Sequence, residues 1–145
     1  MPRVYVSSVI DASAEAVWER VRDFNGLPNW HPRIRDSRIE GGEPADKVGC
    51  IRDFHLQNGD RIREQLLGLS DYDMFCTYAI LESPMPLTDY VATLRLTPIT
   101  DGPRCFIEWS AEFDCAEADA EGLVDGIGSN VFQAGFDALK RKLGG

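Results

Sequence analysis

Hydrophobic and polar residues alternate along much of the chain, a pattern typical of strands that bury one face and expose the other. Clusters of Gly, Pro, Asn and Asp interrupt the alternation and favour turns. We predict strands over residues 4–10, 34–39, 48–56, 61–69, 74–81, 89–96 and 105–115. The dipeptide Asn58-Gly59 between two of these runs predicts a tight two-residue turn, because both residue types tolerate positive φ. The strands on either side of it should therefore pair antiparallel.

Helical spacing appears in two parts of the chain. Apolar residues recur from Val17 at intervals of four and then three, after Ser13, a residue type that caps helix N-termini. Residues 27–31 should add a short second helical turn. Residues 119–143 carry apolar side chains at helical spacing and predict one long C-terminal helix. The segment contains four glycines, Gly122, Gly126, Gly128 and Gly135. Because glycine has a low helix propensity, their presence suggests close packing or an open cavity at these positions.

This order of elements is typical of an α+β fold. We expect an arrangement in which a curved seven-stranded antiparallel sheet wraps around the long C-terminal helix and two short helices follow the first strand. With 145 residues, 43% of them hydrophobic, the chain is long enough for one full core and too short for two ordinary domains. We therefore expect a single domain over residues 1–145.

Two charged residues interrupt the apolar faces of neighbouring predicted strands. Arg52 shares one face of its strand with Phe54, and Glu64 lies between Ile62 and Leu66 on the next strand. A buried charge without a partner is costly, or it is neutralised by a shift of its pKa. We therefore expect Arg52 and Glu64 to pair, to line a wet cavity, or both, in place of a solid apolar core.

Several residues carry a family resemblance. In chain order they are the segment Trp30-His31-Pro32, the segment Val48-Gly49-Cys50 with Arg52-Asp53 after it, the dipeptide Asn58-Gly59, Glu64, and Tyr90 after the loop at residues 84–88. On these residues the chain resembles the START-like superfamily of polyketide cyclase/dehydrase and lipid-transport proteins, with the birch-allergen fold. The segment Trp30-His31-Pro32 is similar to bacterial polyketide cyclases, and the other residues are similar in particular to the plant abscisic acid receptors. The resemblance covers nearly the whole chain. It implies a helix-grip fold with a large cavity between the sheet and the long helix.

The resemblance also implies roles for individual residues. Phe54 and Leu56 match positions that line the receptors' cavity, Tyr78 matches an aromatic wall position, and Glu64 and Tyr90 match polar residues that hold water and ligand. Adding the residues of the same strand or helix face, we expect a small apolar ligand to contact Phe54, Leu56, Tyr78, Tyr90, Leu94, Trp109, Ile127 and Val131.

The sequence departs from the receptors at two positions of the cavity. His31 stands where the receptors have a lysine that pairs with the ligand's carboxylate, and Trp109 stands where they have a glutamate. Abscisic acid itself is therefore not the expected ligand. The loop at residues 57–60 is shorter than the receptors' gate, and residues 85–87 lack their latch sequence, so a gate-and-latch switch is not implied.

Three residues are candidates for acid–base chemistry at such a cavity, namely Glu64, His31 and Arg52. Burial would raise the pKa of Glu64 and Arg52 would lower it, which makes Glu64 a tunable acid; the alternative is a static ion pair that braces two strands. His31, held between Trp30 and Pro32, would lie at the cavity mouth and orient a ligand or transfer a proton. The alternative for His31 is a partly exposed side chain at a helix end.

Composition excludes several classes of function. The net charge of −9 and the lack of a long basic block disfavour nucleic-acid binding, and no apolar run is long enough to span a membrane, so we expect a cytoplasmic protein. The four cysteines form no C-x-x-C pair and are expected to be reduced core thiols. No nucleotide or cofactor motif is present, and two histidines are too few for a conventional multi-histidine site, so we expect no cofactor and no metal.

The sequence thus leaves three classes of function open. The first is a carrier or sensor that binds a small, largely apolar molecule of lipid, polyketide or aromatic type. The second is a cofactor-free cyclase or dehydratase of polyketide-like substrates that uses the acid–base residues of the cavity. The third is a module that binds a partner protein through the loop at residues 84–88. A homodimer is compatible with each of them, and fold analogy alone does not choose among them.

Overall fold

The computed structural model describes residues 1–143, so the last two residues of the expected domain lie outside the described part. Seven strands and a few helical segments follow one another along the chain. The strands are β1 (Arg3–Ile10), β2 (Ile34–Ile39), β3 (Ile51–Leu56), β4 (Arg61–Ser70), β5 (Phe75–Glu82), β6 (Leu87–Ile99) and β7 (Arg104–Cys115). The helical segments are α1 (Ala14–Val21), η1 (Leu27–Asn29), η2 (Glu40–Gly42), α2 (Glu117–Gly126), η3 (Ile127–Gln133) and α3 (Ala134–Leu143).

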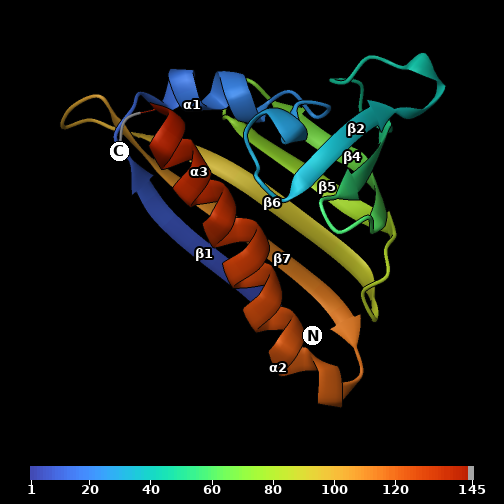
Figure 1. Cartoon of the computed structure of the whole chain (residues 1–145). Coiled ribbons are helices and arrows are strands. Elements are labelled where there is room, and N and C mark those ends of the chain that lie inside the picture. Colours follow the sequence, from blue (N-terminus) through green and yellow to red (C-terminus); the bar gives the residue numbers. More distant parts are fainter. Residues whose placement is uncertain (144–145) are drawn as a thin grey trace.

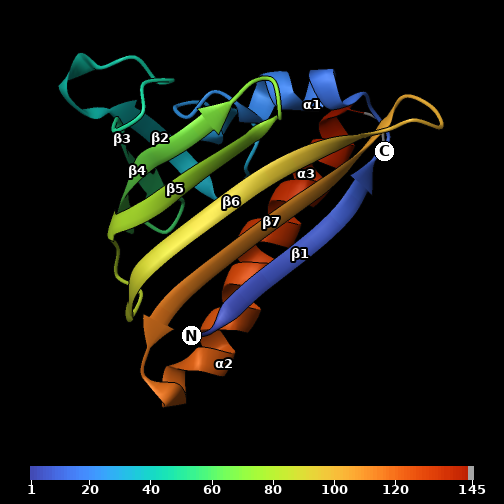
Figure 2. The ribbon, with the colours of Figure 1, turned by 180° about the vertical axis from the view of Figure 1, so that it is seen from behind.

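All seven strands form one antiparallel sheet with the order β1-β7-β6-β5-β4-β3-β2. The sheet curves around the C-terminal helix, and α1 lies across one end of it (Figure 1). Seen from behind, the other face of the sheet carries no helix (Figure 2). The expected helix-grip fold is confirmed, including the two short helical segments after the first strand, α1 and η1. No helix within residues 1–143 is long and apolar enough to cross a membrane.

The alternation read from the sequence decides which face of each strand is buried. On β7, Ile107, Trp109 and Phe113 are at most 3% exposed, whereas Glu112 between them on the opposite face is exposed. Helix α1 begins where predicted, because the Ser13 side chain accepts a hydrogen bond from the backbone N–H of Ala16 at 3.2 Å. The concave face and the C-terminal helix thus share one apolar core.

Two local predictions about strand β3 are corrected. Residues 48–50 are not part of the strand: Gly49 has a φ of 98° that turns the chain, which leaves Val48 58% exposed instead of on the buried face. The β3–β4 connection is not a two-residue turn with two positive φ angles, since only Gly59 has one, of 96°. Instead, the Asn58 side chain accepts a hydrogen bond from the Asp60 N–H at 2.9 Å.

The C-terminal helix is also not one regular α-helix over residues 119–143. It begins at Glu117, and its middle section η3 has π-helical turns, which are wider than those of an α-helix. In such turns the backbone hydrogen bonds join residues that are five positions apart, and not four as in an α-helix. The Val131 carbonyl in this section accepts a hydrogen bond from a side chain of the opposite layer, the Nε2 atom of His31 at 2.7 Å.

Gly135, just after the π-helical section, allows the helix to approach the aromatic core closely. A Cβ atom at this position would lie 3.0 Å from Trp30 Cζ3 and 3.1 Å from both His31 Cδ2 and Trp109 Cζ3. These are ring atoms of buried side chains, which have little room to move. The absence of a side chain at Gly135 is therefore a packing requirement. A Cβ atom added at Gly122, in α2, would have no atom within 4 Å.

We predict opposite effects for alanine at these two glycines. Gly135→Ala should destabilise the protein by about 1–3 kcal/mol because it overpacks the core. Gly122→Ala should be neutral or stabilise by up to about 1 kcal/mol, because alanine has the higher helix propensity. Urea unfolding of both variants measures the difference. Equal effects at the two positions would contradict the close packing of Gly135.

Candidate functional site

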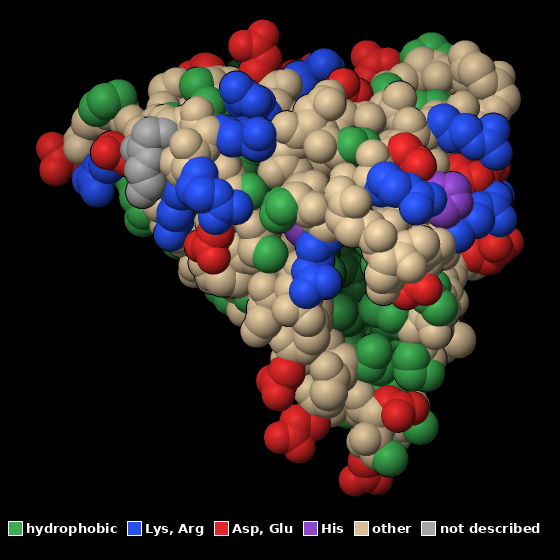
Figure 3. All heavy atoms as spheres, viewed as in Figure 1, with side chains coloured by type: hydrophobic (Ala, Val, Ile, Leu, Met, Phe, Trp, Pro, Cys, Tyr) green, Lys and Arg blue, Asp and Glu red, His purple; other side chains and the backbone are tan. Residues whose placement is uncertain are grey.

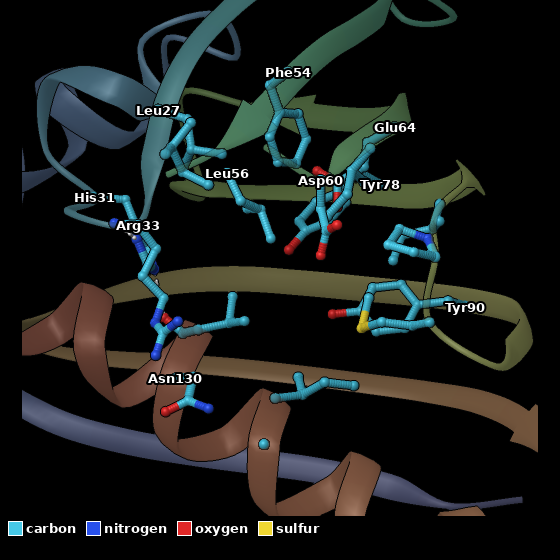
Figure 4. Close-up of a pocket in the computed structure, with 18 of the residues that line it drawn as sticks. Leu27, His31, Arg33, Phe54, Leu56, Asp60, Glu64, Tyr78, Tyr90 and Asn130 are labelled. Atoms are coloured by element: carbon cyan, nitrogen blue, oxygen red, sulfur yellow. Dashed lines mark hydrogen bonds between the residues drawn. The ribbon is translucent and has the colours of Figure 1, made fainter. Parts of the chain in front are cut away.

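A cavity of about 250 Å³ lies between the concave face of the sheet and the C-terminal helix. Its wall is mostly apolar, and the space-filling view shows hydrophobic side chains inside a hollow that opens on the face seen in Figure 3. Strands β3 to β7 supply one wall, and residues of α2 and η3 supply the other (Figure 4). The cavity is therefore enclosed by elements from both halves of the chain.

Arg52 and Glu64 form a buried ion pair in the sheet wall of this cavity. They are directly opposite each other in the β3–β4 register, and each residue is 6% exposed. Arg52 Nε donates a hydrogen bond to Glu64 Oε1 at 2.9 Å, and Arg52 Nη2 lies 2.7 Å from the same oxygen in the ion pair. No hydrogen bond from residues 1–143 reaches the other carboxylate oxygen of Glu64, Oε2. The pairing predicted from the sequence is thus present, and it leaves one acceptor oxygen at the cavity.

The Arg52 guanidinium is also held by three further groups. Its Nη1 atom donates to the Phe24 carbonyl at 3.1 Å, and its carbon Cζ lies 4.0 Å from the ring centre of Phe24 and 4.8 Å from that of Tyr78. Cation–π contacts of this kind stabilise a desolvated guanidinium. Arg52 is thereby fixed by the protein itself, and it fixes Glu64 in turn.

Burial controls the protonation of the acidic groups around the cavity. Desolvation raises the pKa of Glu64, although the charge of Arg52 and its hydrogen bonds act in the opposite direction. Desolvation also raises the pKa of Tyr78 and Tyr90 above the ordinary phenol value, so both are neutral hydroxyls near pH 7. Figure 4 shows the Tyr90 hydroxyl pointing into the cavity, on the side where Glu64 and Tyr78 lie.

Trp109 forms the aromatic wall of the cavity. Its indole Nε1–H donates to the Tyr78 hydroxyl at 3.0 Å, and its ring is stacked on Phe132 with the ring centres 4.5 Å apart. The wall therefore joins strand β5, strand β7 and the C-terminal helix, and the indole N–H is satisfied within the protein.

His31 lines the cavity, but the protein itself binds both of its ring nitrogens. Its Nε2 atom is 2.7 Å from the Val131 carbonyl, and its Nδ1 atom accepts a bond from the Arg33 backbone N–H at 3.3 Å. These partners define the neutral tautomer with the proton on Nε2. Burial lowers the pKa of His31, which favours the same neutral form. The side chain is 2% exposed and connects η1 to the π-helical turn.

The exposed lining residues mark the opening of the cavity. Arg33 lies between η1 and β2, Asp60 ends the β3–β4 turn, Pro84 belongs to the β5–β6 connection, and Asn130 lies in η3. The opening is therefore surrounded by three loops and one helix face. Two of its groups, Arg33 and Asp60, carry opposite charges.

The structure brings most of the predicted site residues together. The three acid–base candidates Glu64, His31 and Arg52 all line the cavity, as do Phe54, Leu56, Tyr78, Tyr90, Trp109, Ile127 and Val131. Leu94 differs, because it is buried but does not line the cavity. It pairs with Cys76 and Trp109 in the sheet register and belongs to the filled part of the core. His55 lies on the opposite face of β3, paired with Asp36 at 2.8 Å, as its position in the strand predicts.

Sequence reasoning missed further lining residues. Ile62 and Ile80 follow the same strand alternation as Glu64 and Tyr78, so that signal was sufficient to find them. Arg33, Asp60 and Asn130 gave no periodic signal, because two of them lie in connections and the third in an irregular helix turn. Within residues 1–143, no group of His, Cys, Asp and Glu side chains is arranged to hold a metal ion.

The fold and the cavity together define a helix-grip protein with an internal apolar pocket. The chain belongs to the polyketide cyclase/dehydrase and lipid transport family, whose model matches residues 1–144. The family resemblance read from the sequence is thereby confirmed. Among curated proteins, none has a sequence significantly similar to this chain.

Solved structures with the same fold cover nearly the whole chain. The protein XoxI from Bacillus cereus is 30% identical, with a TM-score of 0.86 over 99% of this chain and 96% of its own. A protein from Thermobifida fusca is 29% identical, with a TM-score of 0.88 over 98% and 93% of the two chains. Norcoclaurine synthase from Thalictrum flavum, solved with dopamine and hydroxybenzaldehyde, is 19% identical, with a TM-score of 0.75 over 97% and 84%. This last likeness concerns the fold alone.

We predict that the Arg52–Glu64 pair is strongly coupled in stability. Arg52→Met or Glu64→Leu alone leaves a buried charge without its partner, whereas the double variant leaves none. The double variant should therefore be more stable than either single variant, by about 1–3 kcal/mol. Denaturant unfolding of the three variants and the wild type gives the four free energies of unfolding that make up the double-mutant cycle. Strictly additive losses would mean that the two side chains do not interact.

Proposed function

We propose that this protein binds a small, largely apolar molecule of lipid, polyketide or aromatic type in its internal cavity, as a carrier or sensor. The observation that carries the proposal is an apolar cavity with only a few polar groups converging on it. Arg52 and both ring nitrogens of His31 are held by hydrogen bonds to the protein. The polar groups left for a ligand at the inner end are Glu64 Oε2 and the Tyr90 hydroxyl.

The volume of the cavity favours a compact ligand. Drug-sized ligands occupy pockets of about 300–1,000 Å³. At about 250 Å³, this cavity suits a molecule of one or two rings or a short chain better than a two-chain lipid. An ionised Glu64 accepts hydrogen bonds only, so a hydroxyl at the inner end of the ligand would be its favoured partner.

A pair of tryptophan substitutions on strand β5 tests this proposal. Ile80 lines the cavity, whereas Leu81 beside it belongs to the opposite face and is 44% exposed. Naphthalene-2-carboxamide, a neutral two-ring probe, should bind to the wild type. Ile80→Trp should weaken this binding by at least about tenfold, because the indole would occupy the cavity. Leu81→Trp should leave it unchanged. Calorimetric titration measures both, and equal affinities of the two variants would contradict binding in the cavity.

A second candidate function is a cofactor-free cyclase or dehydratase, and the position of Glu64 favours it. The carboxylate has a pKa raised by burial, a free oxygen at the cavity and a fixed orientation through Arg52. These properties suit a general acid or base that moves a proton to or from a bound ketone or hydroxyl. In this function Arg52 positions Glu64, and His31 positions the helix wall through the Val131 carbonyl.

Glu64→Gln distinguishes the enzyme from the carrier, because glutamine keeps the shape and still accepts hydrogen bonds from Arg52. If the protein dehydrates or cyclises β-hydroxy ketone substrates, this variant should lower turnover at least about 100-fold. Naphthalene-2-carboxamide binding serves as the control and should persist. Substrate conversion is followed by mass spectrometry. Full turnover in Glu64→Gln would exclude Glu64 as the proton-transfer group, and binding without any turnover would support the carrier.

A further inference from the structure

Arg33, at the opening of the cavity, has no oppositely charged partner within residues 1–143. Arg33 lines the cavity and is exposed, and its guanidinium forms no ion pair or hydrogen bond with these residues. Its backbone, in contrast, is held on both sides. The Arg33 N–H donates to His31 Nδ1 at 3.3 Å, and the Arg33 carbonyl accepts from the Gln57 N–H at 2.8 Å. The fold therefore fixes the backbone position from which the Arg33 side chain reaches the opening.

Asn130 adds an uncharged donor on the same side of the opening. Both Arg33 and Asn130 line the cavity, and Figure 4 shows their side chains beside the C-terminal helix. The Asn130 amide also forms no hydrogen bond with residues 1–143. A guanidinium and an amide N–H on the same side of an opening are a favourable setting for a carboxylate.

The other charges of the cavity define the orientation of such a ligand. At the inner end, Glu64 is acidic and its Arg52 partner is already engaged, so a ligand carboxylate there would meet a like charge. Asp60 lies at the opening as well, and its carboxylate accepts a bond from Asn58 Nδ2 at 3.2 Å. The side of the opening formed by Arg33 and Asn130 is thus the favourable place for a negative group.

We propose that the ligand is an apolar or aromatic monocarboxylic acid, held with its carboxylate on Arg33 and Asn130 at the opening and its other end toward Glu64 and Tyr90. This inference rests on the proposed function, because it assumes that the cavity is the binding site. It specifies the chemical class of the ligand and its orientation in the cavity. Arg33 is then a specificity-determining residue that separates acids from neutral molecules of the same shape.

Two probes of matched shape test the charge recognition. Naphthalene-2-carboxylate and naphthalene-2-carboxamide differ mainly in charge. At low ionic strength the wild type should bind the carboxylate about threefold to tenfold more tightly than the amide, and salt should reduce the difference. Arg33→Gln should abolish this preference while amide binding persists. Arg35→Gln is the matched control, because Arg35 is exposed, pairs with Asp36 and does not line the cavity. It removes the same charge and should keep the preference.

The outcomes separate this inference from the proposed function. Amide binding without a preference for the carboxylate in the wild type would overturn the inference and leave the cavity proposal in place. An equal loss of preference in Arg33→Gln and Arg35→Gln would also overturn it, because net charge would then explain the effect. Failure of both probes to bind to the wild type would overturn the two proposals together. Asn130→Asp, which adds a negative charge at the same side of the opening, should also abolish the preference, and an unchanged preference in this variant would overturn the inference.

Discussion

Arg52 and Glu64 face each other across β3 and β4 on the concave side of the sheet, where their neighbours are apolar. Two charges in such a place are tolerated only when their hydrogen bonds and charges are compensated. Here the compensation comes from Glu64 Oε1, the Phe24 carbonyl and the faces of two aromatic rings. The segment after α1 and strands β3, β4 and β5 must therefore meet at one point. The inner end of the cavity depends on that arrangement.

The opposite wall is built by a helix adapted to the same cavity. The π-helical section between α2 and α3 presents Ile127 and Val131 to the cavity, while its Val131 carbonyl accepts a hydrogen bond from His31 Nε2–H. Gly135 then brings the helix against Trp30 and Trp109. The helix is thus packed closely against the aromatic core at Gly135.

Much of the fold could be predicted because it depends on local alternation and on the family pattern. Strand alternation identified the inward positions of Phe54, Tyr78 and Trp109, and it placed Arg52 and Glu64 on the inward faces of neighbouring strands. It failed at Val48, where the positive φ of Gly49 ends the strand, since alternation does not encode the backbone angle of one residue.

The candidate site was less predictable, because its details depend on tertiary contacts. No sequence pattern indicates that both nitrogens of His31 are bound by backbone groups, one of them 100 positions away. No sequence pattern indicates the π-helical section or the place of Arg33 at the cavity opening either. Leu94 has the inward orientation that alternation predicts, but the filled core beside Trp109 leaves no space there. Orientation toward the interior is therefore necessary for a lining residue and not sufficient.

The central claim is that the space between the sheet and the C-terminal helix takes up a ligand. Nuclear Overhauser effects between unlabelled naphthalene-2-carboxamide and ¹³C-labelled methyl groups of the protein test this claim most directly. The account predicts contacts of the probe with the methyl groups of Leu56, Ile80, Ile127 and Val131, which line the cavity from both walls. Contacts only with exposed methyl groups, such as those of Leu67 and Leu81 on the other face of the sheet, would contradict it.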